Sequence, residues 1–222
     1  MAILTVYTKL LDQTLEGARI IDMGSTKTCQ CFVLPSDSVS RICKEYLVGK
    51  SAFYILLGKC DIGLPWAYIG QTNDFANRVA DHKQNKDWWD TALVFVSKAD
   101  EIFASETQYL EYLGWKSANE SSLYHITNSK PIKEPRLSDD KKYDMELFFE
   151  EIKFLTRFYG CKIFDNLRIG VKGTEIAEVY TVEVKKRGIS ANLQYSPCTR
   201  SFILLEGSLI SAIETSCSKK AK

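Results

Sequence analysis

The stretch that decides the fold is Ser51–Gly58, with the sequence SAFYILLG, followed by Trp66–Gly70, with the sequence WAYIG. The first is a compact apolar run, which predicts a buried strand. A loop containing Gly63 and Pro65 separates the two runs. The second run predicts another strand, so the pair indicates an antiparallel hairpin with a long connection.

Outward from this hairpin, the pattern predicts further strands and helices. Thr72 or Asn73 can cap a helix from about Phe75 to Lys83, with Phe75 and Val79 on its buried side. A third strand is predicted at Leu93–Val96. The longer helix predicted over residues 102–116 has an apolar stripe of Ile102, Phe103, Tyr109, Leu110 and Leu113.

The regions on either side suggest the domain organisation. Residues 1–50 are expected to form an α/β extension that packs on the core, with a strand near Thr28–Leu34 and a helix from Ser38 to about Tyr46. Residues 51–130 form the predicted core, and residues 131–144, rich in proline and charge, form a linker. Residues 145–222 are expected to form a helix that ends near Gly160 and a small β-rich domain. The whole chain is therefore expected to be α+β.

Composition narrows the class of protein without identifying it. Hydrophobic residues make up 45% of the chain, charged residues 26%, and the formal net charge is +1, close to the average for a globular protein. The chain has no apolar run of about 18 residues and no recognisable signal peptide, so we expect no membrane partner and a cytoplasmic location. Seven scattered cysteines predict reduced thiols; the close pair Cys29 and Cys31 is expected to give one buried and one exposed thiol rather than a metal site.

The net charge is divided unevenly along the chain. Residues 51–130 carry 7 Lys and Arg against 10 Asp and Glu, whereas residues 131–222 carry 16 against 13. If the protein binds DNA, we expect attraction to the phosphates to come from local placement of cations or from the second half of the chain.

An ordered set of residues within 51–128 resembles the GIY-YIG nuclease family. The set comprises Phe53-Tyr54-Ile55, Tyr68-Ile69-Gly70, Arg78 and His82, Tyr109-Leu110-Glu111, and Asn128. The resemblance implies a small antiparallel sheet flanked by helices and a metal-dependent endonuclease. Such an enzyme hydrolyses DNA phosphodiester bonds with one divalent ion, Mg²⁺ or Mn²⁺, and needs no small-molecule cofactor. One departure is that Ala52-Phe53-Tyr54 stands where the family usually has Gly-Ile-Tyr.

The resemblance also implies a role for each residue. Tyr54 would be the base for water if its surroundings lower its pKa, and Tyr68 would orient water or phosphate. Arg78 would stabilise charge on the phosphoryl oxygens, which its planar fork matches. Glu111 would hold the metal, because Mg²⁺ keeps most of its waters and needs few protein ligands. His82, one helical turn from Arg78, would assist proton transfer or contact phosphate; Asn128 would brace the site, and Gly70 would permit a tight exit from the strand.

Each assignment has a simpler alternative. The tyrosines could serve packing alone, Arg78 could pair with Asp74 four residues earlier, and His82 could be structural. Periodicity does not choose between Glu106 and Glu111 on the same helix; the resemblance favours Glu111. For the protein as a whole, the alternative to an enzyme is a module with the same fold that binds nucleic acid or protein without cutting. An unrelated fold would not bring Tyr54, Tyr68, Arg78 and Glu111 together.

The C-terminal segment from Gly188 to Ser208 resembles a small domain of unknown function that is often appended to such nucleases. Before it, Lys185, Lys186 and Arg187 are candidate nucleic-acid contacts. The alternative is a solvated basic turn in a β-rich module without a site of its own. No dimer motif is visible, so the oligomeric state stays open.

Overall fold

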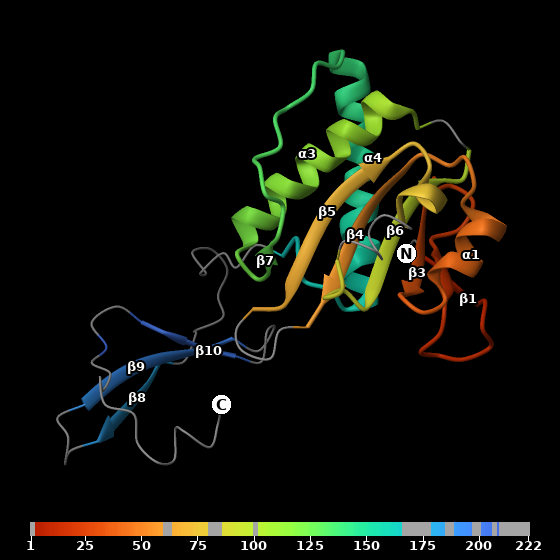
Figure 1. Cartoon of the computed structure of the whole chain (residues 1–222). Helices are drawn as coiled ribbons and strands as arrows, with labels where there is room; N and C mark the ends of the chain where they lie inside the picture. The colour runs from red at the N-terminus through yellow and green to blue at the C-terminus, as the bar shows by residue number, and fades with distance from the viewer. Residues whose placement is uncertain are drawn as a thin grey trace. The chain divides into compact units, whose positions relative to one another are not determined.

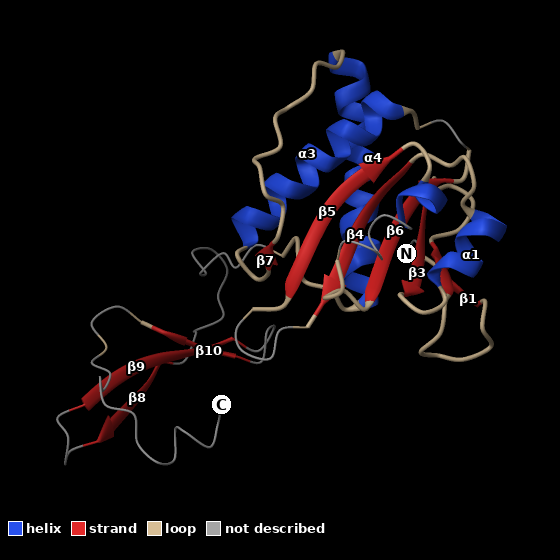
Figure 2. Ribbon diagram, in the orientation of Figure 1, coloured by secondary structure: helices blue, strands red, loops and turns tan. Residues whose placement is uncertain are grey.

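The computed structural model describes residues 3–59, 64–79, 86–99, 102–165, 179–184, 189–196, 201–205 and 208. The chain divides into two compact units, Met1–Leu167 and Arg168–Lys222. Helices and a sheet occur together in the first unit, so the expected α+β class is confirmed (Figure 2). Within the described residues the sheet is mixed and has seven strands, however, so the expectation of a small antiparallel sheet is wrong: three N-terminal strands within residues 7–35 extend the same sheet.

The first unit is built on a seven-stranded sheet in the order β1-β2-β3-β6-β4-β5-β7 (Figure 1). Neighbouring strands are antiparallel except β5 and β7, which are parallel. The predicted hairpin is therefore confirmed as β4 and β5, and the predicted third strand as β6, which pairs with β4. The strands are β1 Tyr7–Leu10, β2 Arg19–Asp22, β3 Cys29–Pro35, β4 Ala52–Gly58, β5 Trp66–Thr72, β6 Thr91–Ser97 and β7 His125–Ile126.

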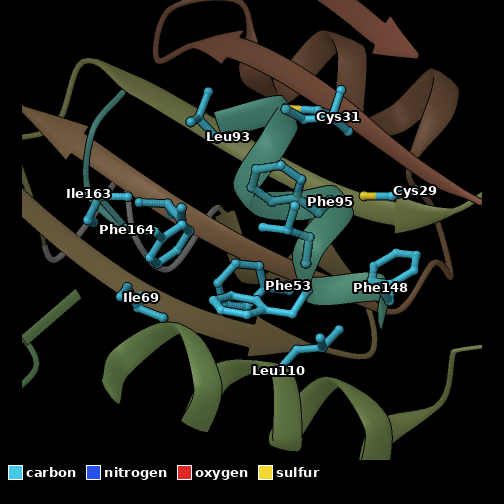
Figure 3. Packing of buried hydrophobic residues seen from close by; sticks show 14 of the residues in the cluster. Cys29, Cys31, Phe53, Ile69, Leu93, Phe95, Leu110, Phe148, Ile163 and Phe164 are labelled. Carbon is cyan, nitrogen blue, oxygen red and sulfur yellow. The ribbon is translucent and has the colours of Figure 1, made fainter. Parts of the chain in front are cut away.

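One face of this sheet is covered by α3, Ala104–Ser121, and α4, Asp139–Tyr159. Alternate residues of a strand point to opposite faces, so Phe53 and Ile55 of β4 face these helices. The Phe53 ring lies 5.8 Å from that of Phe95 and 6.5 Å from that of Phe149. Figure 3 shows Phe53 in the same buried cluster as Leu110 of α3 and Phe148 of α4. Fully burying one such side chain contributes about 2 kcal/mol.

The opposite face carries the second core. Ala52, Tyr54 and Leu56 of β4 pack there with α1, Val39–Tyr46, and with the helical residues 75–79. Phe75 and Val79 are buried, as the spacing predicts. The predicted helix from Phe75 to Lys83 is thus confirmed as far as residue 79; its remaining residues, His82 among them, lie outside the described part of the chain.

The boundary between the two units differs from the expected linker at residues 131–144. Helix α4 begins at Asp139 and belongs to the first unit, because Phe148, Phe149 and Ile152 are buried in the core. Asp139 and Asp140, expected in the linker, occupy the first helical turn, where negative charge is favourable. The Glu151 carboxylate also accepts hydrogen bonds from the backbone N–H of Cys29 at 2.9 Å and of Thr28 at 3.1 Å.

Two local predictions are wrong for identifiable reasons. Cys29 and Cys31 are both fully buried, because residues two apart on a strand point to the same face. Phe103 is 63% exposed, because α3 starts only after it; the helix instead buries Tyr109, Leu110 and Ala118.

The second unit contains a three-stranded antiparallel sheet in the order β10-β9-β8. Its strands are β8 Val179–Val184, β9 Ile189–Ser196 and β10 Ser201–Leu204. Lys185, Lys186 and Arg187 lie outside the described residues. Within the described part of both units, no helix is both long and apolar enough to cross a membrane.

Candidate functional site

The site starts with two tyrosines on neighbouring strands. Tyr54 of β4 lies directly opposite Gly70 of β5, and Leu56 lies opposite Tyr68, so both tyrosines share the sheet face that carries the helical residues 75–79. Their ring centroids are 6.2 Å apart, and the Tyr54 ring packs edge-on against Phe75 at 5.1 Å. Tyr54 is fully buried and Tyr68 is half-buried.

Gly70 has a different role from the one expected. It lies inside β5 rather than at its exit. A Cβ on Gly70 would lie 2.5 Å from both Cζ and the hydroxyl oxygen of Tyr54. Glycine is therefore needed here to leave room for the tyrosine ring.

Arg78 connects the helical segment to both tyrosines. Its guanidinium donates side-chain hydrogen bonds to the hydroxyl oxygens of Tyr54 and Tyr68. Hydrogen bonds at the start of this helical segment fix the direction in which it leaves β5. Thr72 Oγ1 accepts from the Asp74 N–H at 3.1 Å, and Asp74 Oδ1 accepts from the Asn77 N–H at 3.3 Å. The Asp74 carboxylate also accepts from Asn77 Nδ2 at 2.9 Å, so Asp74 caps the helix instead of Thr72 or Asn73.

Glu111 reaches the same place from α3, which runs alongside the outer edge of β5 (Figure 1). The backbone N–H of Gln71 donates a hydrogen bond to the Glu111 carboxylate. The Thr107 hydroxyl in turn donates to Gln71 Oε1 at 3.1 Å. Gly114 permits this approach, because a Cβ there would lie 2.6 Å from the Phe53 ring. The helix therefore holds Glu111 against the strand that carries Tyr68.

The electrostatics show that these groups interact. Burial raises the pKa of Glu111 to about 7, opposed by the Arg78 charge. Burial also raises the pKa of Tyr54; the nearby Tyr68 adds to the effect, and the hydrogen bond from Arg78 opposes it. Tyr54, Tyr68, Arg78 and Glu111 thus form one cluster, hereafter the four-residue cluster, although they come from separate elements of the chain.

The structure also separates Glu106 from Glu111. Glu106 is 4% exposed and forms an ion pair with Lys141 of α4, and its carboxylate accepts from Ser105 Oγ at 2.7 Å. Burial raises the pKa of Glu106, but these hydrogen bonds outweigh it and leave the pKa lowered. Glu106 therefore joins α3 to α4 and lies apart from the four-residue cluster.

Asn128 braces the strand that carries Tyr68. Its Oδ1 accepts from the Ile69 N–H at 3.0 Å, and its Nδ2 donates to the Ile69 carbonyl at 2.7 Å. Ile69 lies between Tyr68 and Gly70 on β5, beyond the short pairing with β7. The side chain thus substitutes for a neighbouring strand where β7 has ended.

Three residues that the sequence reasoning missed lie on the same face. The Lys86 ammonium lies 4.3 Å from the centroid of the Tyr68 ring. Burial lowers the pKa of Lys86, and the positive charge of Arg78 lowers it further. Trp66 and Trp88 pack against each other nearby, with centroids 5.7 Å apart. No spacing rule identifies them, because Lys86 and Trp88 follow a polar stretch with no regular period.

Glu111 is the carboxylate of the four-residue cluster that could hold a divalent ion. Among the described residues, no group of three or more His, Cys, Asp or Glu side chains gathers to hold a metal. A single carboxylate still fits Mg²⁺ or Mn²⁺ that retains most of its waters. The described residues around Glu111 therefore fit such a hydrated ion.

Comparisons with known proteins add no assignment. No family model matches the chain, and neither a curated protein nor a solved structure is significantly similar to it.

Proposed function

We propose that this chain is a metal-dependent DNA endonuclease of the GIY-YIG type, which hydrolyses phosphodiester bonds with a single divalent ion. The observation that supports this best is the four-residue cluster. Tyr54, Tyr68, Arg78 and Glu111 come from β4, β5, the helical residues 75–79 and α3, yet Arg78 hydrogen-bonds both tyrosines and the charge of Glu111 acts on Arg78 and Tyr54. A group that served only packing would not require an arginine hydrogen-bonded to two tyrosines or a partly buried carboxylate near them. Charged groups in such surroundings are typical of functional sites.

Arg78 is proposed to bind the scissile phosphate. Attack of water on phosphorus builds negative charge on the phosphoryl oxygens, which a fixed guanidinium stabilises. Its hydrogen bonds to Tyr54 and Tyr68 hold the planar group in one orientation before substrate arrives. The fork then needs little reorganisation as the charge develops.

Glu111 is proposed to hold the divalent ion. When bound, the ion would neutralise charge on the leaving oxygen. The Gln71 N–H fixes the carboxylate. Because the pKa of Glu111 is about 7, the carboxyl is largely ionised above neutral pH and ready to bind a cation.

The two tyrosines are proposed to have different roles: Tyr54 positions Arg78, and Tyr68 positions the attacking water. Tyr54 was expected to be the base, provided that its pKa is lowered, but burial raises it. We therefore give Tyr54 the task of fixing Arg78. The half-buried Tyr68 is the candidate to orient the water whose oxygen forms the new bond to phosphorus. His82 and Asn128 keep their proposed roles, in proton transfer or phosphate contact and in bracing β5.

The alternative is a module of the same fold that binds nucleic acid or protein without cutting. Two observations favour it: the buried Tyr54 with its raised pKa, and the excess of acidic residues in the first unit. Both would weaken catalysis or substrate attraction, but neither removes Arg78 or Glu111 from the cluster.

The test is nicking of supercoiled plasmid in Mg²⁺ or Mn²⁺ by the full chain. Arg78→Ala and Glu111→Ala should each reduce the rate by about 100-fold or more. The matched controls Arg157→Ala and Glu120→Ala change exposed residues on α4 and α3 and should leave the rate unchanged. Nicking that persists in both cluster variants, or with the metal chelated, contradicts the proposal. Binding to DNA without any nicking supports the alternative.

A further inference from the structure

The two tryptophans beside the four-residue cluster form a continuous surface with it. Trp66, Tyr68 and Gly70 alternate along β5 and so share one face. Trp66 lies opposite Gly58 of β4, and Trp88 packs against Trp66 with its ring turned by 72°. Both indoles are half-buried, so each also presents part of its surface to solvent. The exposed His125 adds a ring 6.0 Å from Trp66.

The position of Trp88 is fixed by the backbone around it. The Asp90 N–H donates to the Leu57 carbonyl at 2.9 Å, and the Ser36 N–H donates to the Asp90 carbonyl at 2.8 Å. Trp89 is buried and anchors the segment. Gly58 is required beneath Trp88, because a Cβ there would lie 2.2 Å from the Trp88 carbonyl oxygen and 2.7 Å from its ring. The indole is therefore held in place before any ligand binds.

Two cations, Lys86 and Arg78, lie beside Tyr68. Lys86 covers the Tyr68 ring and is close enough to Arg78 for the two positive charges to interact unfavourably. An anion placed between them would relieve this cost. In contrast, the residues next to Trp88 and Trp89 in the chain, Asp87 and Asp90, are acidic and exposed. A phosphate therefore suits the Lys86–Arg78 side, and an uncharged aromatic group suits Trp88.

A phosphate side next to partly exposed aromatic rings suits nucleic acid whose base faces are accessible. Base pairs inside a duplex hide their faces in the stack, whereas unpaired bases stack on protein aromatic side chains. From Trp66 to Gly70 is roughly 13 Å along the strand. At most about four stacked nucleotides cover that distance, since successive phosphates of one strand rise by about 3.4 Å.

We infer that Trp66 and Trp88 form a stacking platform for unpaired bases within about four nucleotides of the phosphate held by Arg78 and Lys86. This rests on the proposed function and narrows its substrate class. The preferred substrate is DNA that is splayed, flapped or single-stranded next to the cut, rather than continuous duplex.

The test separates binding from cutting. Fluorescence anisotropy of the full chain, with the metal chelated so that no cutting occurs, is measured on labelled duplex, on 5′-flap and 3′-flap duplexes and on single strands. We expect at least one flap to bind about 10-fold more tightly than the duplex. Trp88→Ala and Trp66→Ala should each remove about 5- to 100-fold of flap affinity, while Trp88→Phe restores most of it.

A double-mutant cycle shows whether the bases are what the platform binds. Replacing the flap nucleotides by abasic ones keeps every phosphate but removes the bases, so the loss should be at least that of Trp88→Ala. On the abasic flap, Trp88→Ala should then cost little more. The control Phe158→Ala removes a 52% exposed aromatic ring of α4 and should leave affinity unchanged.

Equal binding of flap and duplex, or an additive cycle, would overturn the inference, whether or not plasmid is nicked. Selective flap binding without nicking would leave the inference standing and contradict the proposed catalysis. Nicking without flap selectivity would support the proposed catalysis and overturn the inference.

Discussion

Tyr54 and Gly70 face each other across β4 and β5, and the tyrosine ring occupies the space where any side chain at position 70 would begin. The Cβ of a residue at 70 would lie 2.5 Å from the Tyr54 hydroxyl oxygen. That hydroxyl accepts a hydrogen bond from Arg78. Because Gly70 has no side chain, Tyr54 can take this position and hold Arg78, the proposed phosphate-binding residue, by a hydrogen bond.

Gly70→Ala should therefore damage both stability and the site. The displaced Tyr54 ring must move within a packed core, which costs about 1–3 kcal/mol of unfolding free energy, and Arg78 loses one of its supports. Urea unfolding and plasmid nicking measure the two effects. In a Tyr54→Leu background the same change should cost clearly less stability; an equal cost in both backgrounds would contradict the explanation.

Glu111→Gln should stabilise the fold at high pH while abolishing activity. The carboxyl ionises near its ordinary pKa of 4.5 in the unfolded chain but near 7 in the fold. The fold thus binds more protons between these values, and stability falls as pH rises through that window. The shift corresponds to a few kcal/mol, which partial exposure reduces to about 1–2 kcal/mol.

The measurement is thermal unfolding at pH 4.5 and pH 8. Glu111→Gln should gain at pH 8 and change little at pH 4.5, whereas the exposed Glu120→Gln on the same helix should change little at either. Added Mg²⁺ at pH 8 should raise the melting temperature of the native chain but not of Glu111→Gln. A pH-independent gain would rule out this account of Glu111.

Asn128→Ala should weaken the edge of β5. It removes two hydrogen bonds and leaves the Ile69 N–H and carbonyl without their side-chain partner, a loss of about 2 kcal/mol. Hydrogen exchange at the Ile69 amide should accelerate, which reports on this position directly. Asn119→Ala, which removes one exposed hydrogen bond on α3, should cost less than about 0.5 kcal/mol; similar losses for both variants would argue against a bracing role.

Removing residues 168–222 should weaken DNA binding and flatten its salt dependence. Cutting near residue 143 would remove α4 and its core contacts, so the boundary at residue 167 is the one to use. Residues 1–167 carry 20 Lys and Arg against 23 Asp and Glu, and residues 168–222 carry 9 against 5.

Without the second unit, the slope of log affinity against log salt should decrease by roughly 1–3. Circular dichroism verifies that the first unit remains folded; an unchanged affinity and slope would place the DNA-binding charge in the first unit.

Short-range patterns were enough to predict much of the first unit. The apolar runs at Ser51–Gly58 and Trp66–Gly70 predict the hairpin because strand formation follows local hydrophobicity and β-propensity. The same reasoning fails where partners far along the chain decide the outcome. Helix α4 was assigned to the second domain, because a helical apolar stripe does not reveal which core it packs against.

The candidate site divides in the same way. The ordered residues Tyr54, Tyr68, Arg78, Glu111 and Asn128 can be read from the sequence. Periodicity alone could not choose Glu111 over Glu106, which pairs with Lys141 of a helix more than thirty residues further along the chain. Lys86, Trp66 and Trp88 have no sequence signature. They lie near Tyr68 only because β5 pairs with β4 and because the chain before β6 places Trp88 over Gly58 and Lys86 over the Tyr68 ring.

The sequence by itself determined the hairpin, its flanking helices and the types of side chain available to the candidate site, because these depend on neighbours a few residues apart. Tertiary structure decided which of those side chains meet, which carboxylate is paired and which tyrosine is buried. Burial and long-range contact set the charge state and exposure of each group, and neither is encoded in local spacing.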